Sequence, residues 1–189
     1  DQIVFTDEPP SARTPLDAQD DFGSMGLAVL GDGANAFAQT QIAIEPADAV
    51  FADAAVTTTE AVLPFGRKLI GAVGRKLTLA PGAQGEATFI VTWFFPGLRR
   101  RTLGPLQDIA KLRRAYANRF QSAADVARYV TREFDRLAGQ TRLWHQTWYD
   151  STLPCWFLDR TFAPICTLAT STCYQFDSGR FYAFEGVYC

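Results

Sequence analysis

The residue pattern changes abruptly after Pro96-Gly97, and this change constrains the possible folds more than any other feature of the sequence. Before it, short runs rich in β-branched and aromatic residues alternate with Gly and Pro turn signals. After it come Leu98 and three consecutive arginines, and from Leu106 apolar residues recur at every third or fourth position. The pattern predicts an α+β chain of more than one domain, in which a solvated basic linker separates a β domain over residues 1–104 from helices.

The N-terminal part is predicted to form antiparallel strands. Runs with strand character cover residues 26–30, 37–44, 61–65, 76–80 and 87–95, and a turn over residues 81–86 separates the last two. In the last run Phe89, Val91 and Trp93 share one face, and further apolar residues lie on the other face. A strand that is apolar on both faces is typical of the centre of a sheet, so we expect an antiparallel β-sandwich of two sheets.

Residues 105–143 are predicted to be a linker and helical segment. From Leu106 to Leu137 the apolar residues trace one face of a helix. The sequence Ser122-Ala123-Ala124-Asp125 has the form of a capping box, so a helix is expected to begin at Ala123, and Gly139 is expected to end it. Acidic and basic residues alternate on its polar face, which favours packing on a neighbouring domain over binding to a membrane surface.

Residues 144–189 are predicted to begin a second, helical domain. This stretch holds 12 of the 25 aromatic residues of the chain. A helix start is expected over residues 150–154, where Asp150, Ser151 or Thr152 can cap and Pro154 suits the first turn, and the helix should run from Trp156 to Phe162. A strand, a turn at residues 177–180 and a second strand are expected between residues 171 and 184.

Charge and hydropathy exclude two classes of partner. The chain has 189 residues with 18 basic and 20 acidic side chains, a net charge of −2. This balance provides no surplus of positive charge to neutralise a phosphate backbone, so nucleic acid is not expected as a partner. No apolar run approaches the roughly 20 residues of a membrane-spanning helix, so no transmembrane segment is expected.

The cysteine pattern argues against a metal site and against a disulfide framework. Cys155, Cys166, Cys173 and Cys189 are spaced without the close pair that structural zinc sites use, and His145 is the one histidine. We therefore expect no metal, no cofactor and buried free thiols. The lack of a disulfide pattern favours a cytoplasmic location.

The aromatic residues after position 144 allow two interpretations. Tyr and Trp rings interleaved with carboxylates and Arg suit a carbohydrate site, because sugars pack their C–H faces on rings, but the same residues also suit a core. Glycoside hydrolysis requires two carboxylates. We interpret Asp150 as a helix cap and Asp177 as a turn residue. We interpret Asp159 as a surface residue or as the partner of Arg160 within one helix. Glu185, beside Gly186, is the carboxylate placed to act on a ligand.

Several passages resemble glycoside hydrolase family 116, the group of the non-lysosomal glucosylceramidase (bile-acid β-glucosidase) and its bacterial β-glucosidase and β-xylosidase relatives. In the C-terminal part these passages are WHQTWYDSTLP at 144–154, TLATSTC at 167–173 and GRFYAFEGV at 179–187. In the N-terminal part they are FGSMGLA at 22–28, LAPG at 79–82 and TWFFP at 92–96. Their order and spacing together carry the resemblance, which extends over nearly the whole chain.

The resemblance implies a fold and a mechanism. The fold is an N-terminal β-sandwich joined by helices to an (α/α)6 barrel, of which residues 144–189 are the beginning. The mechanism is that of a retaining β-glycosidase with Glu185 as the nucleophile. Its substrates are β-glucosides or β-xylosides, and they include lipid-linked glucosides. The side chains expected to contact the sugar are Trp148, Tyr149, Arg180 and Tyr182.

The same resemblance implies that this chain alone is inactive. The acid/base aspartate of the family lies far beyond the nucleophile, and a barrel of twelve helices needs more residues than follow Gly104. A retaining glycosidase with one carboxylate has no proton donor for the leaving group. The chain is therefore expected to be a fragment of the enzyme. The alternative is a non-catalytic module that binds carbohydrate or a protein partner.

Overall fold

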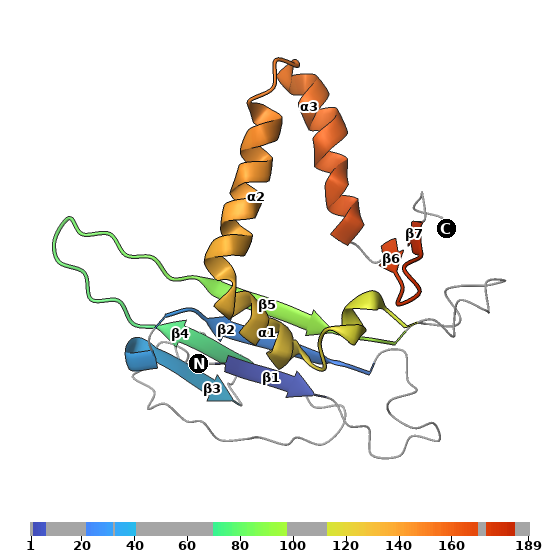
Figure 1. The fold of residues 1–189 in the computed structure, drawn as a ribbon. Coiled ribbons are helices and arrows are strands. Elements are labelled where there is room, and N and C mark those ends of the chain that lie inside the picture. The colour runs from blue at the N-terminus through green and yellow to red at the C-terminus, as the bar shows by residue number, and fades with distance from the viewer. Residues whose placement is uncertain are drawn as a thin grey trace, which may run out of the picture. The chain divides into compact units, whose positions relative to one another are not determined.

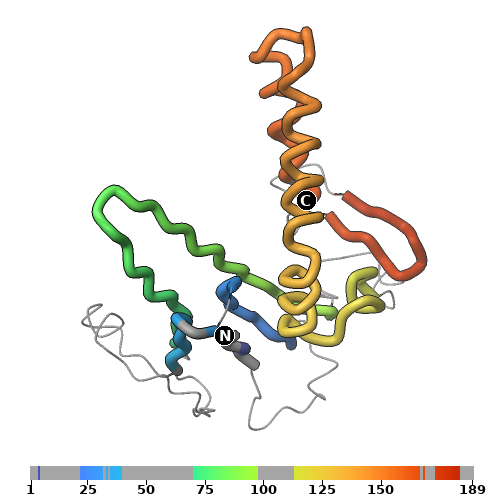
Figure 2. The backbone as a smooth tube through the Cα atoms, turned by 60° about the vertical axis from the view of Figure 1, so that its left-hand side comes forward, coloured from blue at the N-terminus to red at the C-terminus, as the bar shows by residue number. Residues whose placement is uncertain are grey.

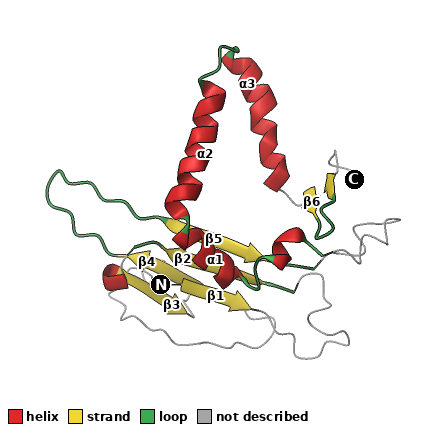
Figure 3. Cartoon of the chain, viewed as in Figure 1, coloured by secondary structure: helices red, strands yellow, loops and turns green. Residues whose placement is uncertain are grey.

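The computed structural model describes residues 2–6, 22–31, 33–40, 70–97, 113–169 and 173–183. These residues fall into two compact units (Figure 1). One contains the described residues up to 97 together with residues 120–131, and the other contains residues 113–119 and those from 132 onward. Strands are the main regular structure of the first unit, whereas the second is largely helical (Figure 3). The predicted boundary near residue 104 lies outside the described residues.

The first unit contains a three-stranded antiparallel sheet. Its strands are β1 (Gln2–Thr6), β2 (Ser24–Val29) and β5 (Phe89–Phe94), in the order β1-β2-β5. Gly26 lies opposite Thr92 in the register of β2 and β5. The strands predicted at 26–30 and 87–95 are thereby confirmed to within a few residues, and their pairing joins segments 60 to 70 residues apart in the sequence. The predicted central position of the second strand is wrong among the described strands, because β5 ends the order. Its face with Ile90 and Phe94 is buried, whereas Phe89, Val91 and Trp93 are exposed.

A two-stranded sheet lies against the first one. Its strands are β3 (Ala36–Thr40) and β4 (Gly71–Arg75), which run antiparallel. Buried Ala38 and Val73 pack against Leu27 of β2, so the two sheets share an apolar contact. Strand β3 agrees with the beginning of the run predicted at 37–44. The rest of that run and the strand predicted at 61–65 lie outside the described residues.

The strand predicted at residues 76–80 is wrong. The strand that pairs is β4, immediately before it, and residues 76–88 form a long connection (Figure 2). In its turn the Ala83 amide donates to the Ala80 carbonyl oxygen (2.9 Å). Gly74 explains the difference, because a Cβ there would lie 2.1 Å from the Phe37 ring. Only glycine allows this close approach of ring and backbone, and a glycine-rich strand has little strand propensity in sequence.

Helix α1 (Ala123–Arg132) docks on the three-stranded sheet through buried polar contacts. The Ala123 amide donates to Ser24 Oγ (2.9 Å), and the Thr92 hydroxyl donates to the Ala123 carbonyl oxygen (3.0 Å). Ser24 and Thr92 are both buried, so these bonds are shielded from water. Gly26 permits the approach, since a Cβ there would lie 2.6 Å from Thr92 Oγ1 and 3.6 Å from Ala123 Cβ.

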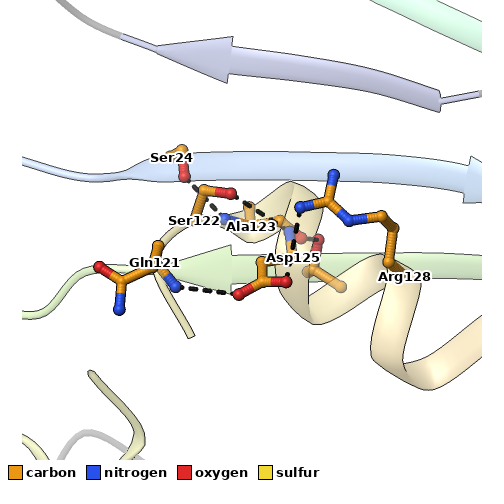
Figure 4. A network of polar contacts seen from close by, with 7 residues as sticks. Ser24, Gln121, Ser122, Ala123, Asp125 and Arg128 are labelled. Atoms are coloured by element: carbon orange, nitrogen blue, oxygen red, sulfur yellow. Dashed lines mark hydrogen bonds and ion pairs between the residues drawn. The ribbon is translucent and has the colours of Figure 1, made fainter. Parts of the chain in front are cut away.

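The start of α1 confirms the predicted cap. The Asp125 amide donates to Ser122 Oγ (3.2 Å), and Asp125 Oδ2 accepts from the Gln121 amide (3.2 Å; Figure 4). In a capping box the acidic side chain accepts from the backbone amide of the cap residue, here Ser122. In this structure it accepts from the backbone amide of the preceding residue instead. Exposed Arg128 contacts Asp125 Oδ1 at 3.4 Å, and such an exposed pair contributes little to stability.

The single helical face predicted up to Leu137 is interrupted, and Gly139 does not end a helix. Residues 119–122 are not helical, α1 ends at Arg132, and α2 (Phe134–Tyr149) passes through Gly139. The break is at Glu133, whose side chain accepts from Arg136 Nε (2.9 Å). Gly139 has no positive φ, and a glycine inside a helix costs only about 1 kcal/mol, which the other residues of a long helix offset.

Helix α3 (Cys155–Phe162) follows α2 after a short turn (Figure 1). The predicted helix over residues 156–162 is confirmed, and a 3-10 helix over Ala163–Ala169 continues it. Asp150 ends α2, with its amide donating to the Gln146 carbonyl oxygen (2.8 Å), and does not cap α3. Pro154 occupies the cap position instead of the first turn. None of the described helices is long and apolar enough to cross a membrane.

The predicted strand-turn-strand is confirmed as an antiparallel hairpin of β6 (Cys173–Gln175) and β7 (Phe181–Ala183). The Phe176 amide donates to the Arg180 carbonyl oxygen (2.9 Å), and Gly179 has a φ of 80°. That left-handed conformation requires a residue without a Cβ clash, which is why the turn uses glycine.

Candidate functional site

The aromatic residues of α2 and α3 gather into one cluster. The Phe162 ring of α3 lies 4.9 Å from Trp148 and 5.2 Å from Trp144 of α2, measured between ring centroids. The two Trp rings are 6.3 Å apart at an edge-to-face angle of 71°. Trp148 and Phe162 are half-buried, whereas Trp144 remains 41% exposed. The cluster holds the helical hairpin together and still presents aromatic surface to solvent.

Tyr149 connects this cluster to a carboxylate. Its hydroxyl donates to Asp159 Oδ1 of α3 (3.1 Å), and its ring meets Phe162 at 85° with 6.0 Å between centroids. The His145 ring lies 4.7 Å from the Tyr149 ring on the same helix. The hydrogen bond from the neutral phenol to Asp159 raises the pKa of Tyr149, and partial desolvation and the negative charge of Asp159 raise it further. Thus Asp159 pairs across the two helices, which differs from the predicted pairing with Arg160.

Removing the acceptor is expected to lower the pKa of Tyr149. In Asp159→Asn the phenol loses both the charged acceptor and the nearby negative charge, so its pKa should fall towards the ordinary value near 10. Folding raises the pKa of Tyr149, so the pair stabilises the fold fully at pH values below the pKa of this tyrosine in the unfolded chain. This stabilisation is lost as the pH rises through the pKa of Tyr149 in the folded chain. The measurement is an alkaline titration followed by tyrosinate absorbance. Subtracting the titration of Tyr149→Phe leaves the contribution of Tyr149. An unchanged pKa would show that Asp159 is not its partner in solution.

The hairpin and the segment before α1 form a second aromatic cluster. Phe176 is 1% exposed, stacks at 6.1 Å on Tyr174 and meets the Tyr182 ring at 5.4 Å. The Arg114 guanidinium lies 5.1 Å from the centre of the Tyr174 ring, and the Asp177 amide donates to the Arg113 carbonyl oxygen (2.9 Å). This cluster fixes the position of the strand that precedes Glu185.

The predicted site residues therefore divide between the two clusters. Trp148 and Tyr149 meet in the α2–α3 cluster, and half-buried Tyr182 belongs to the hairpin cluster. Arg180 is exposed in the turn of the hairpin. Glu185 lies outside the described residues, two positions after Ala183, the last residue of β7. Its role as nucleophile accordingly stays a prediction.

The predicted thiols are free but not buried. Cys155 and Cys166 are exposed free cysteines, and Cys173 is free and half-buried, while Cys189 lies outside the described residues. The exposure arises because α3 and the 3-10 helix after it turn these residues to solvent. Within the described part of the chain, no group of three His, Cys, Asp or Glu side chains is placed to hold a metal ion.

Asp159 is the residue of the site that sequence reasoning missed. Its partner Tyr149 is ten residues away, on the other side of the helix start predicted at 150–154. If residues 144–162 are treated as two helices joined by a turn, positions equally far from the turn face each other. This symmetry could have suggested the contact between Tyr149 and Asp159.

No protein-family model, curated protein or solved structure matches the chain. The likeness to glycoside hydrolase family 116 consequently rests on the sequence passages alone.

Proposed function

We propose that the chain is the N-terminal domain and the beginning of the catalytic domain of a retaining β-glycoside hydrolase similar to family 116, with Glu185 as the nucleophile. The observation that carries the proposal is the β6–β7 hairpin, whose second strand ends two residues before Glu185-Gly186. The hairpin lies within the passages that resemble the family. It is anchored by buried Phe176.

The proposed fold is a β-sandwich followed by an (α/α)6 barrel. Two antiparallel sheets in contact through Leu27 support the first part. Helices α2 and α3, connected by a short turn, support the second, since such a barrel is built from helical hairpins. The exposed thiols of Cys155 and Cys166 suit a reducing compartment, and we propose the cytoplasm as the location.

The proposed reaction has two steps. The Glu185 carboxylate attacks the anomeric carbon of a β-glucoside or β-xyloside, and the bond to the aglycone breaks as an aspartate outside this chain protonates the leaving oxygen. The same aspartate then removes a proton from water, which attacks the glycosyl-enzyme and releases the sugar with its original configuration. This chemistry needs no metal or cofactor. Lipid-linked glucosides are among the proposed substrates.

Covalent labelling tests the proposal. The full-length protein is incubated with a 2-deoxy-2-fluoro-β-glucosyl fluoride, which transfers its sugar to the nucleophile and loses fluoride. We expect a mass increase of one fluoroglucosyl group, located on a peptide that contains Glu185. Labelling of a different carboxylate contradicts the assignment, and the absence of labelling and turnover with glucosides and xylosides contradicts the hydrolase.

The alternative function is a non-catalytic module that binds carbohydrate or a protein. It is favoured by the exposed aromatic surface of the helical hairpin, where Trp156 is 68% exposed and Trp144 is 41% exposed. The labelling experiment separates the two functions, because a binding module forms no covalent glycosyl-enzyme.

A further inference from the structure

The β6–β7 hairpin pairs with a segment from much earlier in the sequence. Arg114 forms an antiparallel bridge with Phe176, the residue that follows β6. The Asp177 amide donates to the Arg113 carbonyl oxygen (2.9 Å), and the backbone of Arg114 is extended, with a φ of −62° and a ψ of 133°. Residues 113 and 114 therefore extend the hydrogen-bonded ladder of the hairpin on the side of β6.

The side chain of Arg114 brings a cation to the rings of the hairpin. Opposed residues of antiparallel segments lie on the same face, so Arg114 shares a face with Phe176. The guanidinium carbon lies 5.1 Å from the centre of the Tyr174 ring, which is within the range of a cation–π interaction. Tyr174 is 9% exposed and Arg114 is half-buried, so water screens this interaction only in part.

The backbone that carries Arg114 is fixed on its other side. The Arg114 carbonyl oxygen accepts from the Ala117 amide (3.0 Å) at the start of a 3-10 helix over Ala115–Asn118, and Ala117 is fully buried. The neighbouring Arg113 is exposed and contributes its carbonyl oxygen to the hairpin, which a change of its side chain leaves in place. The two adjacent arginines thus offer a matched pair for substitution.

We propose that Arg114 is a positioning residue for the nucleophile. This inference rests on the proposed function, in which Glu185 acts two positions after the end of β7. A reacting group must be held close to its productive position, because a displacement of about 1 Å can cost about 10²-fold in rate. Arg114 acts through Tyr174 and the hairpin and not on the substrate, by holding the strand before Glu185 in one orientation.

The first measurement is made on the purified chain and does not depend on catalysis. Hydrogen exchange of the β6 and β7 amides is compared in wild type, Arg114→Lys and Arg114→Met. Lysine keeps the cation, whereas methionine keeps an apolar side chain without the charge. We expect Arg114→Met to accelerate exchange about tenfold and Arg114→Lys by no more than about threefold. The matched control Arg113→Met should exchange as the wild type does.

The second measurement is the turnover of an aryl β-glucoside by the full-length protein. We expect Arg114→Met to lower kcat about tenfold and to leave KM within about twofold, because the displaced group is the one that reacts. Arg114→Lys should recover most of kcat, and Arg113→Met should match the wild type. The active sites are counted by the 2-fluoro label, so a variant that is merely partly unfolded keeps its kcat per site.

Three outcomes overturn the proposal. The first is equal exchange in wild type and Arg114→Met, and the second is equally fast exchange in Arg114→Lys and Arg114→Met, which would show that the charge does not hold the hairpin. The third is faster exchange with an unchanged kcat per active site. If wild type neither labels nor turns over, the hydrolase fails and the catalytic role of Arg114 fails with it. The exchange data then still show whether Arg114 holds the hairpin, so the two failures are distinguishable.

Discussion

Replacing Glu185 with glutamine is expected to abolish turnover of an aryl β-glucoside by the full-length protein. Glutamine keeps the size and polarity of the side chain but has no carboxylate to form the glycosyl-enzyme. We expect kcat to fall by at least about 10³-fold, equivalent to about 4 kcal/mol of activation free energy. The measurement is the release of the aryl alcohol together with the intact mass after the 2-fluoro glucoside, which should show no adduct.

Two controls separate a nucleophile from a structural glutamate. Asp177→Asn changes the exposed carboxylate in the turn of the β6–β7 hairpin and should leave kcat within about twofold, because surface substitutions rarely disturb a fold. In Glu185→Gly, azide can occupy the space of the lost carboxylate and attack the anomeric carbon, which should yield an α-glycosyl azide. A Glu185→Gln protein that still accepts the 2-fluoro label would show that the nucleophile is elsewhere.

Truncating Phe176 to alanine is expected to unfold the hairpin that precedes Glu185. Phe176 is 1% exposed and contacts the rings of Tyr174 and Tyr182. Removing a buried phenylalanine costs about 3–5 kcal/mol, which approaches the whole stability of a small domain. Hydrogen exchange of the β6 and β7 amides, read by mass spectrometry, should accelerate by roughly two to four orders of magnitude if it occurs by opening of this cluster.

The matched control for this prediction lies in the same hairpin. Phe181 is the same residue type on β7 but is 53% exposed, so Phe181→Ala should change the exchange of these amides little. Equal protection of the hairpin in the two variants would mean that the Phe176 cluster does not stabilise it. The amides of β2 and β5, in the other unit, provide an internal reference for the overall fold.

The elements that could be predicted are those whose signal is local. The alternating residues of β5, the Ser122 cap of α1 and the glycine turn of the β6–β7 hairpin each depend on a few neighbouring residues. Their physical causes, side-chain alternation, an unsatisfied amide and a left-handed φ, can be read from the residue type alone. The structure places the strand, the cap and the turn where the sequence indicated, but it buries the face of β5 with Ile90 and Phe94 and exposes the face with Phe89, Val91 and Trp93.

The elements that were predicted wrongly depend on distant residues. Strand β4 forms because Gly74 admits the Phe37 ring from β3, and the leucines at 77 and 79, which alternate as in a strand, are 42% and 52% exposed. Helix α2 continues through Gly139 because the cost of one glycine is small against that of ending the helix. In each case tertiary context overrode the local propensity.

The candidate site shows the same division. The sequence by itself determined that aromatic and acidic residues concentrate after position 144, that helices precede a hairpin there, and that Glu185 follows the hairpin. Only the tertiary structure decided that Asp159 accepts a hydrogen bond from Tyr149 and that Phe162 contacts both Trp144 and Trp148. The physical reason is that a residue type specifies the donors, acceptors and rings of a side chain, whereas its partner is chosen by the packing of helices whose contacts are not local in sequence.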